Sequence, residues 1–107
     1  MVIMFDLMIY NATIIDGSGA PPKTGNLAIK DGKIVAVGQI EEFEKIGEIG
    51  EDAIEMVDAQ GLCLAPGFID SHSHGDQALG LDCSALSKLA QGITTEIAGQ
   101  CGLSLFP

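Results

Sequence analysis

Residues 65–76 read Ala65-Pro-Gly-Phe-Ile-Asp-Ser-His-Ser-His-Gly-Asp76. The apolar pair Phe68-Ile69 predicts a short strand after the turn formers Pro66-Gly67, and two histidines follow it. Residues i and i+2 of an extended chain project from the same face, so His72 and His74 can both reach one ion. A neutral imidazole is a common ligand of zinc, and the stretch therefore predicts half of a metal site.

A plainer interpretation is that the two histidines are only polar residues at the end of a strand. They are, however, the only two histidines in the chain. Asp70 stands between the strand and the pair, and Asp76 lies just beyond it. This concentration of ligand-type side chains favours the metal interpretation.

The segment from residue 66 onward has the pattern of a strand, a helix and a second strand. We expect strands at Gly67–Ser71 and Ile93–Ala98, and a helix over Ser84–Gln91 with Ser84 as its N-cap and Gly92 as its C-cap. Such a βαβ succession favours parallel strands. The chain has 107 residues, whereas a closed eight-stranded α/β barrel needs about 200 or more, so residues 66–107 predict only the first unit of an incomplete barrel.

Cys101 is the candidate third ligand. In an α/β barrel the active-site loops follow the carboxyl ends of the strands, and Cys101 follows the second predicted strand as the histidines follow the first. A thiolate there can join them on zinc or bridge two metals. The alternative is a small buried apolar residue, which is how most free cysteines behave.

Other polar residues near the predicted site keep two interpretations each. Asp70 either orients a histidine as a carboxylate behind the metal ligands or serves a turn. Asp76 and Glu96 remain open in the same way. Cys63, in an apolar run, and Cys83, just before the helix, are interpreted as structural.

Residues 1–65 are rich in short strand patterns. Leu27–Lys30 and Lys33–Val37 flank Asp31-Gly32, a pair typical of a two-residue type I′ hairpin turn. We expect about six short strands here, forming a small β-sandwich or an open sheet. The other predicted elements are strand patterns at Phe5–Tyr10, Ala12–Ile15, Ala53–Val57 and Leu62–Leu64, and a short helix at Ile40–Glu48. The first two, on either side of Asn11, form either a hairpin or one bent strand. The fold class is therefore mixed β and α/β, with a β-sandwich-type domain at 1–65 and a barrel start at 66–107.

The charge pattern excludes several kinds of partner. Fifteen acidic residues against five basic ones give a formal net charge of −10, so nucleic acid and anionic membrane surfaces would be repelled. No apolar run is long enough to cross a bilayer, and no secretory signal is visible. Three cysteines without a Cys-x-x-Cys spacing indicate free thiols in the cytoplasm.

Several stretches together resemble the amino-terminal region of the amidohydrolase superfamily. They are Gly32-Lys-Ile-Val-Ala-Val-Gly38, Val57-Asp-Ala-Gln-Gly61 and the stretch through His74 quoted above. Gln91-Gly-Ile-Thr-Thr95 and Gly99-Gln-Cys-Gly102 narrow the resemblance to the N-acyl-D-amino-acid deacylase (D-aminoacylase) branch, as does Asp16-Gly-Ser-Gly-Ala-Pro-Pro22. The branch usually has Asn where this chain has Gln100.

The resemblance implies a zinc hydrolase with one or two ions, built from a β-sandwich and a metal-bearing barrel. Its substrates would be small N-acyl-D-amino acids, which it cleaves at the amide bond. By position, His72 and His74 match the histidine pair of the family and Cys101 matches its cysteine ligand. The remaining metal histidines and the catalytic aspartate of the family come from later barrel strands, so no catalytic residue is assigned here and the isolated chain is expected to be inactive.

Two other functions stay open. The first is a different amidohydrolase, such as a cyclic amidase or a dihydroorotase-like enzyme, because the histidine pair is shared widely. The second is a non-catalytic β-rich module that binds metal or serves a structural role. Unpaired parallel strands would also expose sheet edges, which predicts self-association.

Overall fold

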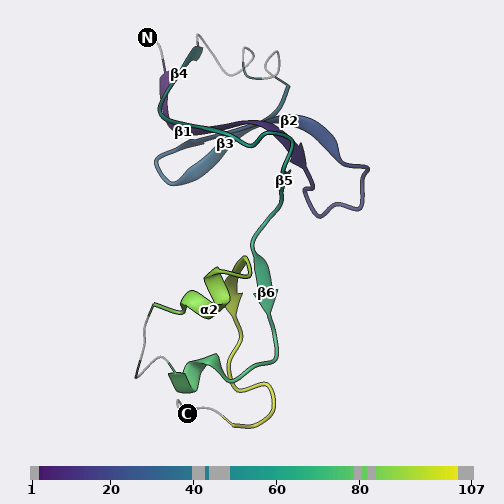
Figure 1. Cartoon of the computed structure of the whole chain (residues 1–107), viewed down its shortest axis with the longest axis vertical. Coiled ribbons are helices and arrows are strands. Elements are labelled where there is room, and N and C mark those ends of the chain that lie inside the picture. Colours follow the sequence, from purple (N-terminus) through teal and green to yellow (C-terminus); the bar gives the residue numbers. More distant parts are fainter. Residues whose placement is uncertain (1–2, 40–42, 44–48, 79–80, 82–83, 104–107) are drawn as a thin grey trace. The chain divides into compact units, whose positions relative to one another are not determined.

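The computed structural model describes residues 3–39, 43, 49–78, 81 and 84–103 (Figure 1). Within them the chain forms two compact units, Met1–Pro66 and Gly67–Pro107. The first unit is a sheet and the second combines strands with short helices. No helix in these described ranges has the length and apolar character needed to span a membrane.

The first unit is organised around its longest strand, β1, which lies inside a five-stranded sheet: four strands have the order β3-β2-β1-β4, and the fifth, β5, also pairs with β1. β2 pairs with β1 in the antiparallel direction, and β3 pairs with β2 in the same way. β4 and β5 both pair with β1 in parallel. The strands are β1 (Ile3–Ile14), β2 (Lys23–Lys30), β3 (Lys33–Gly38), β4 (Ile49–Asp58) and β5 (Cys63–Leu64).

The predicted hairpin at Asp31-Gly32 is confirmed. Both residues have positive φ, 50° and 71°, and Lys30 pairs with Lys33 across the turn. The turn is also held from outside, because the carboxylate of Asp6 accepts the backbone N–H of Asp31 at 2.6 Å and the ammonium of Lys30 at 3.1 Å. A carboxylate that accepts a backbone N–H satisfies a donor that would otherwise need water.

Of the two forms predicted for Phe5–Tyr10 and Ala12–Ile15, a hairpin or a bent strand, the bent strand is confirmed, because both runs belong to the single strand β1. Asn11, with φ of 55°, is absorbed as a bulge in β1, and the register with β2 shifts there. Its side chain donates to Asp58 Oδ1 at 3.1 Å, at the end of β4. Beyond the bulge β1 pairs with β5 instead of β4.

This pairing also decides between the two predicted architectures for residues 1–65. β4 and β5 both extend the sheet that contains β1, so the described residues form one open sheet rather than the two stacked layers of a sandwich. The described residues of the first unit form five strands, whereas about six were predicted for residues 1–65. Bulges commonly bend a strand and re-aim its pairing, which is the part Asn11 plays here.

The buried apolar cluster of the first unit consists of Phe5, Met8, Ala28, Ala36 and Phe43. The rings of Phe5 and Phe43 meet edge to face with centroids 6.3 Å apart, an arrangement that aromatic quadrupoles favour. Phe43 belongs to the predicted helix Ile40–Glu48. The remaining residues of that prediction lie outside the described residues. The apolar position expected on that helix is thus a core residue.

The second unit contains the predicted parallel pair. β6 (Phe68–Asp70) and β7 (Ile93–Glu96) pair in parallel, and between them lie the 3₁₀ helix η2 (Gly75–Ala78) and the helix α2 (Leu86–Leu89). The parallel βαβ connection is confirmed. Both strands are shorter than predicted, since regular pairing stops where the loops carrying the polar residues begin.

The predicted start of the helix at Ser84 is wrong. α2 begins at Leu86 and its N-cap position is Ala85, which has a φ of 50° and makes no side-chain cap bond. A left-handed residue reverses the chain just before the helix, so Ser84 is not in position to cap it. At the other end the cap position is Ala90, and Gly92, with φ of 76°, donates its N–H to the Leu89 carbonyl at 2.9 Å.

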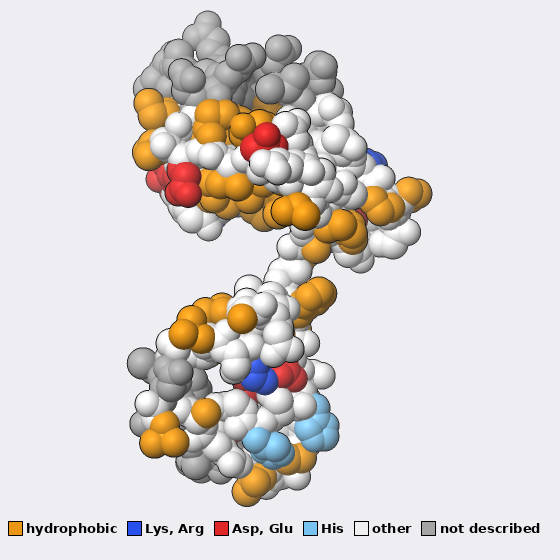
Figure 2. All heavy atoms as spheres, viewed as in Figure 1, with side chains coloured by type: hydrophobic (Ala, Val, Ile, Leu, Met, Phe, Trp, Pro, Cys, Tyr) orange, Lys and Arg blue, Asp and Glu red, His pale blue; other side chains and the backbone are white. Residues whose placement is uncertain are grey.

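Hydrophobic side chains also remain at the surface of both units (Figure 2). In the second unit Phe68, Ile69 and Leu86 are each about two-thirds exposed, at 64%, 65% and 66%. In the first unit Ile54 on β4 is 75% exposed. Neither face of the β6–β7 pair is therefore covered to the degree that parallel sheets usually are.

Candidate functional site

The two histidines lie in the loop that follows β6. The strand ends at Asp70, and His72 and His74 come before η2, with both side chains exposed. Histidine side chains are visible at the surface of the second unit in Figure 2. Because β6 and β7 run in parallel, the loops after both strands emerge at the same edge of the pair.

Cys101 lies in the turn that follows β7. Gly99 and Gly102 on either side both have φ of 81°, and the N–H of Gly102 bonds the Gly99 carbonyl at 3.0 Å. This left-handed backbone, which glycine adopts without steric cost, turns the chain back toward the β6 loop. As a result Cys101 Sγ lies 3.1 Å from His74 Nε2.

The donor set at this contact fits a zinc ion chemically. Zinc in proteins takes thiolate sulfur and imidazole nitrogen, at about 2.3 Å and 2.0 Å. Two such ligands on one tetrahedral ion would lie about 3.5 Å apart, which is close to the separation between the Cys101 sulfur and the His74 nitrogen. Among the described residues, however, no three His, Cys, Asp or Glu side chains converge on one point. His72 is thus near the contact in sequence but does not complete a three-ligand group with it.

Asp70 is engaged by backbone and ammonium groups. Its Oδ1 accepts the backbone N–H of His72 at 3.2 Å, and its Oδ2 accepts Lys88 Nζ from α2. The turn interpretation of Asp70 is therefore the one that the structure shows. A bond from a carboxylate to the N–H two residues on is the usual way in which aspartate stabilises a turn.

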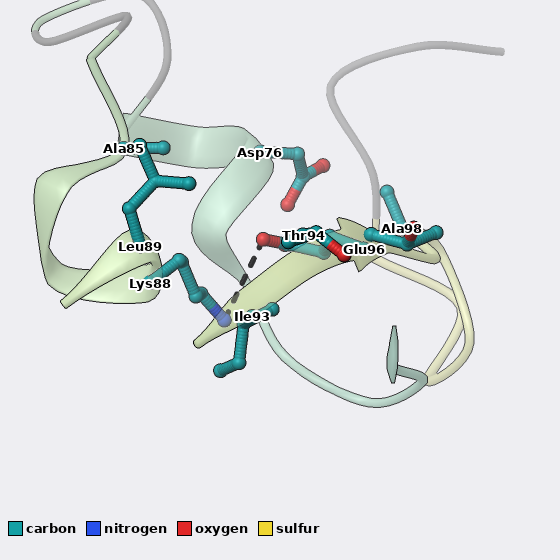
Figure 3. A pocket seen from close by; sticks show the side chains of 9 residues that line it. Asp76, Ala85, Lys88, Leu89, Ile93, Thr94, Glu96 and Ala98 are labelled. Carbon is teal, nitrogen blue, oxygen red and sulfur yellow. Dashed lines mark ion pairs between the residues drawn. The ribbon is translucent and has the colours of Figure 1, made fainter. Parts of the chain in front are cut away.

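Lys88 connects this turn to β7. Its ammonium donates to Ser73 Oγ at 2.6 Å and lies 3.5 Å from Glu96 Oε2, the ion pair drawn in Figure 3. Ser73, the residue between the two histidines, donates its hydroxyl to Glu96 Oε1 at 3.1 Å. We name Asp70, Ser73, Lys88 and Glu96 the lysine network. Glu96, left open above, is part of it.

The lysine network perturbs the acid–base properties of its members. The ammonium of Lys88, the hydroxyl of Ser73 and the backbone N–H of His72 together lower the pKa of Asp70 to about 2. The hydrogen bond to Asp70 raises the pKa of Lys88 above its ordinary value. Both groups are consequently charged at neutral pH.

We expect the second unit to lose stability in acid through Asp70. Its pKa is lower in the folded chain than the ordinary value of 3.8, so its contribution is fully present above about pH 4 and is lost as pH falls toward about 2. Circular dichroism at a series of pH values should show this loss, and Asp70→Asn should reduce the slope in that window. An unaltered slope in Asp70→Asn would contradict the prediction.

Asp76 lies at the start of η2 and is only 3% exposed. It lines a cavity of about 240 Å³ together with Lys88, Leu89, Thr94 and Glu96 (Figure 3). The cavity adjoins the lysine network, and its lining is mostly apolar. Asp76 therefore belongs to the interior of the second unit instead of the exposed loop that holds the histidines.

The part that Lys88 plays was not predicted from the sequence. A signal for it was present, since Lys88 is the only lysine or arginine between residues 67 and 107, among several carboxylates. A lone cation near carboxylates in an apolar helix indicates an ion pair. Of the cysteines interpreted as structural, Cys63 is exposed on β5 and Cys83 lies outside the described residues.

The chain is similar in sequence to known proteins. Residues 55–105 match the model described as "Amidohydrolase family". The chain is 45% identical over 102 residues to N-acyl-D-aspartate deacylase of Alcaligenes xylosoxydans xylosoxydans, covering 95% of this chain and 19% of that protein. It is 39% identical over 103 residues to D-aminoacylase of the same organism, covering 96% and 20%.

A solved structure is similar as well. It is N-acyl-D-glutamate deacylase from Bordetella bronchiseptica, complexed with zinc and a phosphonate inhibitor. The identity is 37% and the TM-score 0.81, over 95% of this chain and 20% of that one. The chain thus spans about a fifth of the length of the relatives that it matches.

Proposed function

We propose that the chain is the amino-terminal part of a zinc-dependent N-acyl-D-amino-acid deacylase of the amidohydrolase family, because residues 55–105 match that family's model and the chain is 45% identical to an N-acyl-D-aspartate deacylase. The reaction is hydrolysis of the amide bond, which yields a carboxylate and a free D-amino acid. The observation that carries the proposal is the 3.1 Å contact between Cys101 Sγ and His74 Nε2 where the loops after two parallel strands meet.

In this proposal His72, His74 and Cys101 hold the metal. A bound zinc ion polarises a carbonyl and lowers the pKa of a water ligand to about 7. The residues of this chain contribute the donor atoms and their placement: a sulfur on a glycine-flanked turn, and imidazoles in the loop after β6. Residues 66–107 then form the first βαβ unit of a metal-dependent hydrolase barrel, and residues 1–65 the amino-terminal part of a β-sandwich-type domain.

We expect the 107-residue chain by itself to be inactive. Hydrolysis needs a general base and acid to move the proton to the leaving amine. The carboxylates Asp70 and Glu96 are both engaged with Lys88. Further metal ligands and the acid–base carboxylate would come from later barrel segments of a longer protein, as would the selection of the D-amino acid.

We also propose the partners of the protein and its location. Small N-acyl-D-amino acids are the expected partners, in the cytoplasm. Exposed sheet edges and apolar side chains such as Phe68 and Ile69 would favour self-association of the short chain. Sedimentation should then show species larger than a monomer.

Cobalt substitution tests the metal site directly. Co²⁺ bound by a thiolate gives a sulfur-to-metal charge-transfer absorption, which we expect from the unsubstituted protein. Cys101→Ala should abolish this absorption, and the matched control Cys63→Ala, an exposed cysteine in the first unit, should keep it. Retention of the absorption and of the bound metal in Cys101→Ala would contradict the deacylase assignment and favour a cyclic amidase or dihydroorotase-like enzyme.

A further inference from the structure

The loop that carries the two histidines is held at three consecutive places. Asp70 accepts the backbone N–H of His72 at 3.2 Å, before the pair. Ser73 lies between the two histidines. Its Oγ accepts a hydrogen bond from Lys88 Nζ at 2.6 Å and donates one to Glu96 Oε1 at 3.1 Å. All of these contacts are made by members of the lysine network, which therefore contacts the loop on both sides of His72.

A third anchor is steric and lies after His74. A β-carbon built on Gly75 would come within 2.9 Å of Glu96 Cδ and would overlap the carboxylate oxygens. The backbone of Gly75 therefore rests against the same carboxylate that binds the Ser73 hydroxyl. Movement of Glu96 would shift the loop, and a side chain at position 75 would displace Glu96.

Lys88 is the group on which the network depends. Its side chain is 20% exposed, and those of Asp70 and Glu96 are 19% and 23% exposed. Without the ammonium, two half-buried carboxylates would face each other as like charges with little solvent to screen them. Ser73 would then lose the ammonium that donates to its hydroxyl oxygen.

We propose that Lys88 is a positioning residue, which holds Asp70, Ser73 and Glu96 and thereby fixes the loop that carries His72 and His74 for metal binding. The inference rests on the proposed function, in which these histidines are ligands. Lys88 itself does not touch the metal or the substrate. Partners that orient ligands from behind usually change metal affinity by about 10–100-fold when they are removed.

The test is a Co²⁺ titration of the purified protein, followed by the charge-transfer absorption and by calorimetry. Lys88→Met should weaken Co²⁺ binding by about 10–100-fold, with thermal unfolding recorded in parallel to establish that the variant is folded. Lys88→Arg, which restores the cation, should recover most of the affinity. Lys33→Met, a lysine on an exposed position of β3, is the matched control and should bind as the parent protein does.

A second variant decides the matter if Lys88→Met does not fold. Ser73→Ala removes only the hydroxyl that joins Lys88 to Glu96, and it should weaken Co²⁺ binding by about fivefold. Co²⁺ affinity equal to that of the parent in the folded variant would overturn the inference while the proposed function stands. Absence of Co²⁺ binding in the parent protein would instead overturn the proposed function, and the inference with it.

Discussion

Replacement of His74 by alanine is expected to lower the hydrolysis of an N-acetyl-D-amino acid by about a thousandfold in the longer deacylase proposed above. Polarisation of a carbonyl by a metal is worth several kcal/mol, and about 1.4 kcal/mol corresponds to a tenfold change in rate. His74 is the histidine in contact with Cys101, at 3.1 Å, so its removal takes away half of the donor pair that the structure brings together. The measurements are kcat/KM and metal content after dialysis.

The matched control for this variant is Gln77→Ala. Gln77 is an exposed residue of η2 three positions further along the same loop and helix, and only its backbone N–H is bonded to the His74 carbonyl, at 3.2 Å. Its truncation should leave both rate and metal content unchanged. If His74→Ala keeps its full metal content, the assignment of His74 as a ligand is wrong. If it keeps its rate as well, so is the proposed mechanism.

The second large effect is expected from Gly67→Ala, which should destabilise the second unit by about 1–3 kcal/mol, the usual cost of overpacking. A β-carbon at Gly67 would lie 2.7 Å from Thr94 Cβ and would overlap the rest of that side chain. Gly67 directly precedes β6 and Thr94 lies on β7, so the overlap would force the two parallel strands apart. The melting temperature should fall by about 4–8 °C for each kcal/mol.

A compensating variant distinguishes this clash from a general effect of changing glycine. Thr94→Gly removes the atoms that the new β-carbon would meet, so Gly67→Ala should cost less in the Thr94→Gly background than alone. Such a coupling between two sites is what a double-mutant cycle measures. Equal costs in the two backgrounds would show that the close approach of Gly67 and Thr94 does not limit stability.

Much of the local structure was predictable because it depends on few neighbouring residues. Asp31-Gly32 needs positive φ at both positions, and aspartate followed by glycine tolerates this conformation, so the hairpin was predicted at its observed position. The parallel pairing of β6 and β7 followed from the strand, helix and strand pattern. Where two local signals competed, the sequence left two outcomes open: Asn11 is a typical turn residue, but the strand continues through it as a bulge because β2, β4 and β5 pair on either side.

In the candidate site, too, the features that depend on neighbouring residues were predicted and those that depend on distant residues were not. Both histidines and Cys101 were identified from their places after predicted strands, and the structure brings Cys101 to His74. The lysine network was not predicted, although Lys88 is the only lysine or arginine between residues 67 and 107. Lys88 was treated only as part of a helix, and no local rule connects it to Ser73, fifteen residues away, or to Asp70, eighteen residues away.

The sequence by itself determined the hairpin turn, the parallel strand pair and the candidate metal ligands. These properties come from backbone preferences and side-chain chemistry that act within a few positions. Only the tertiary structure decided which strands share β1, which carboxylates surround Lys88 and which histidine meets Cys101, 27 residues from His74. Such contacts depend on pairing register, burial and loop conformation over long separations, and these are set by the whole fold together.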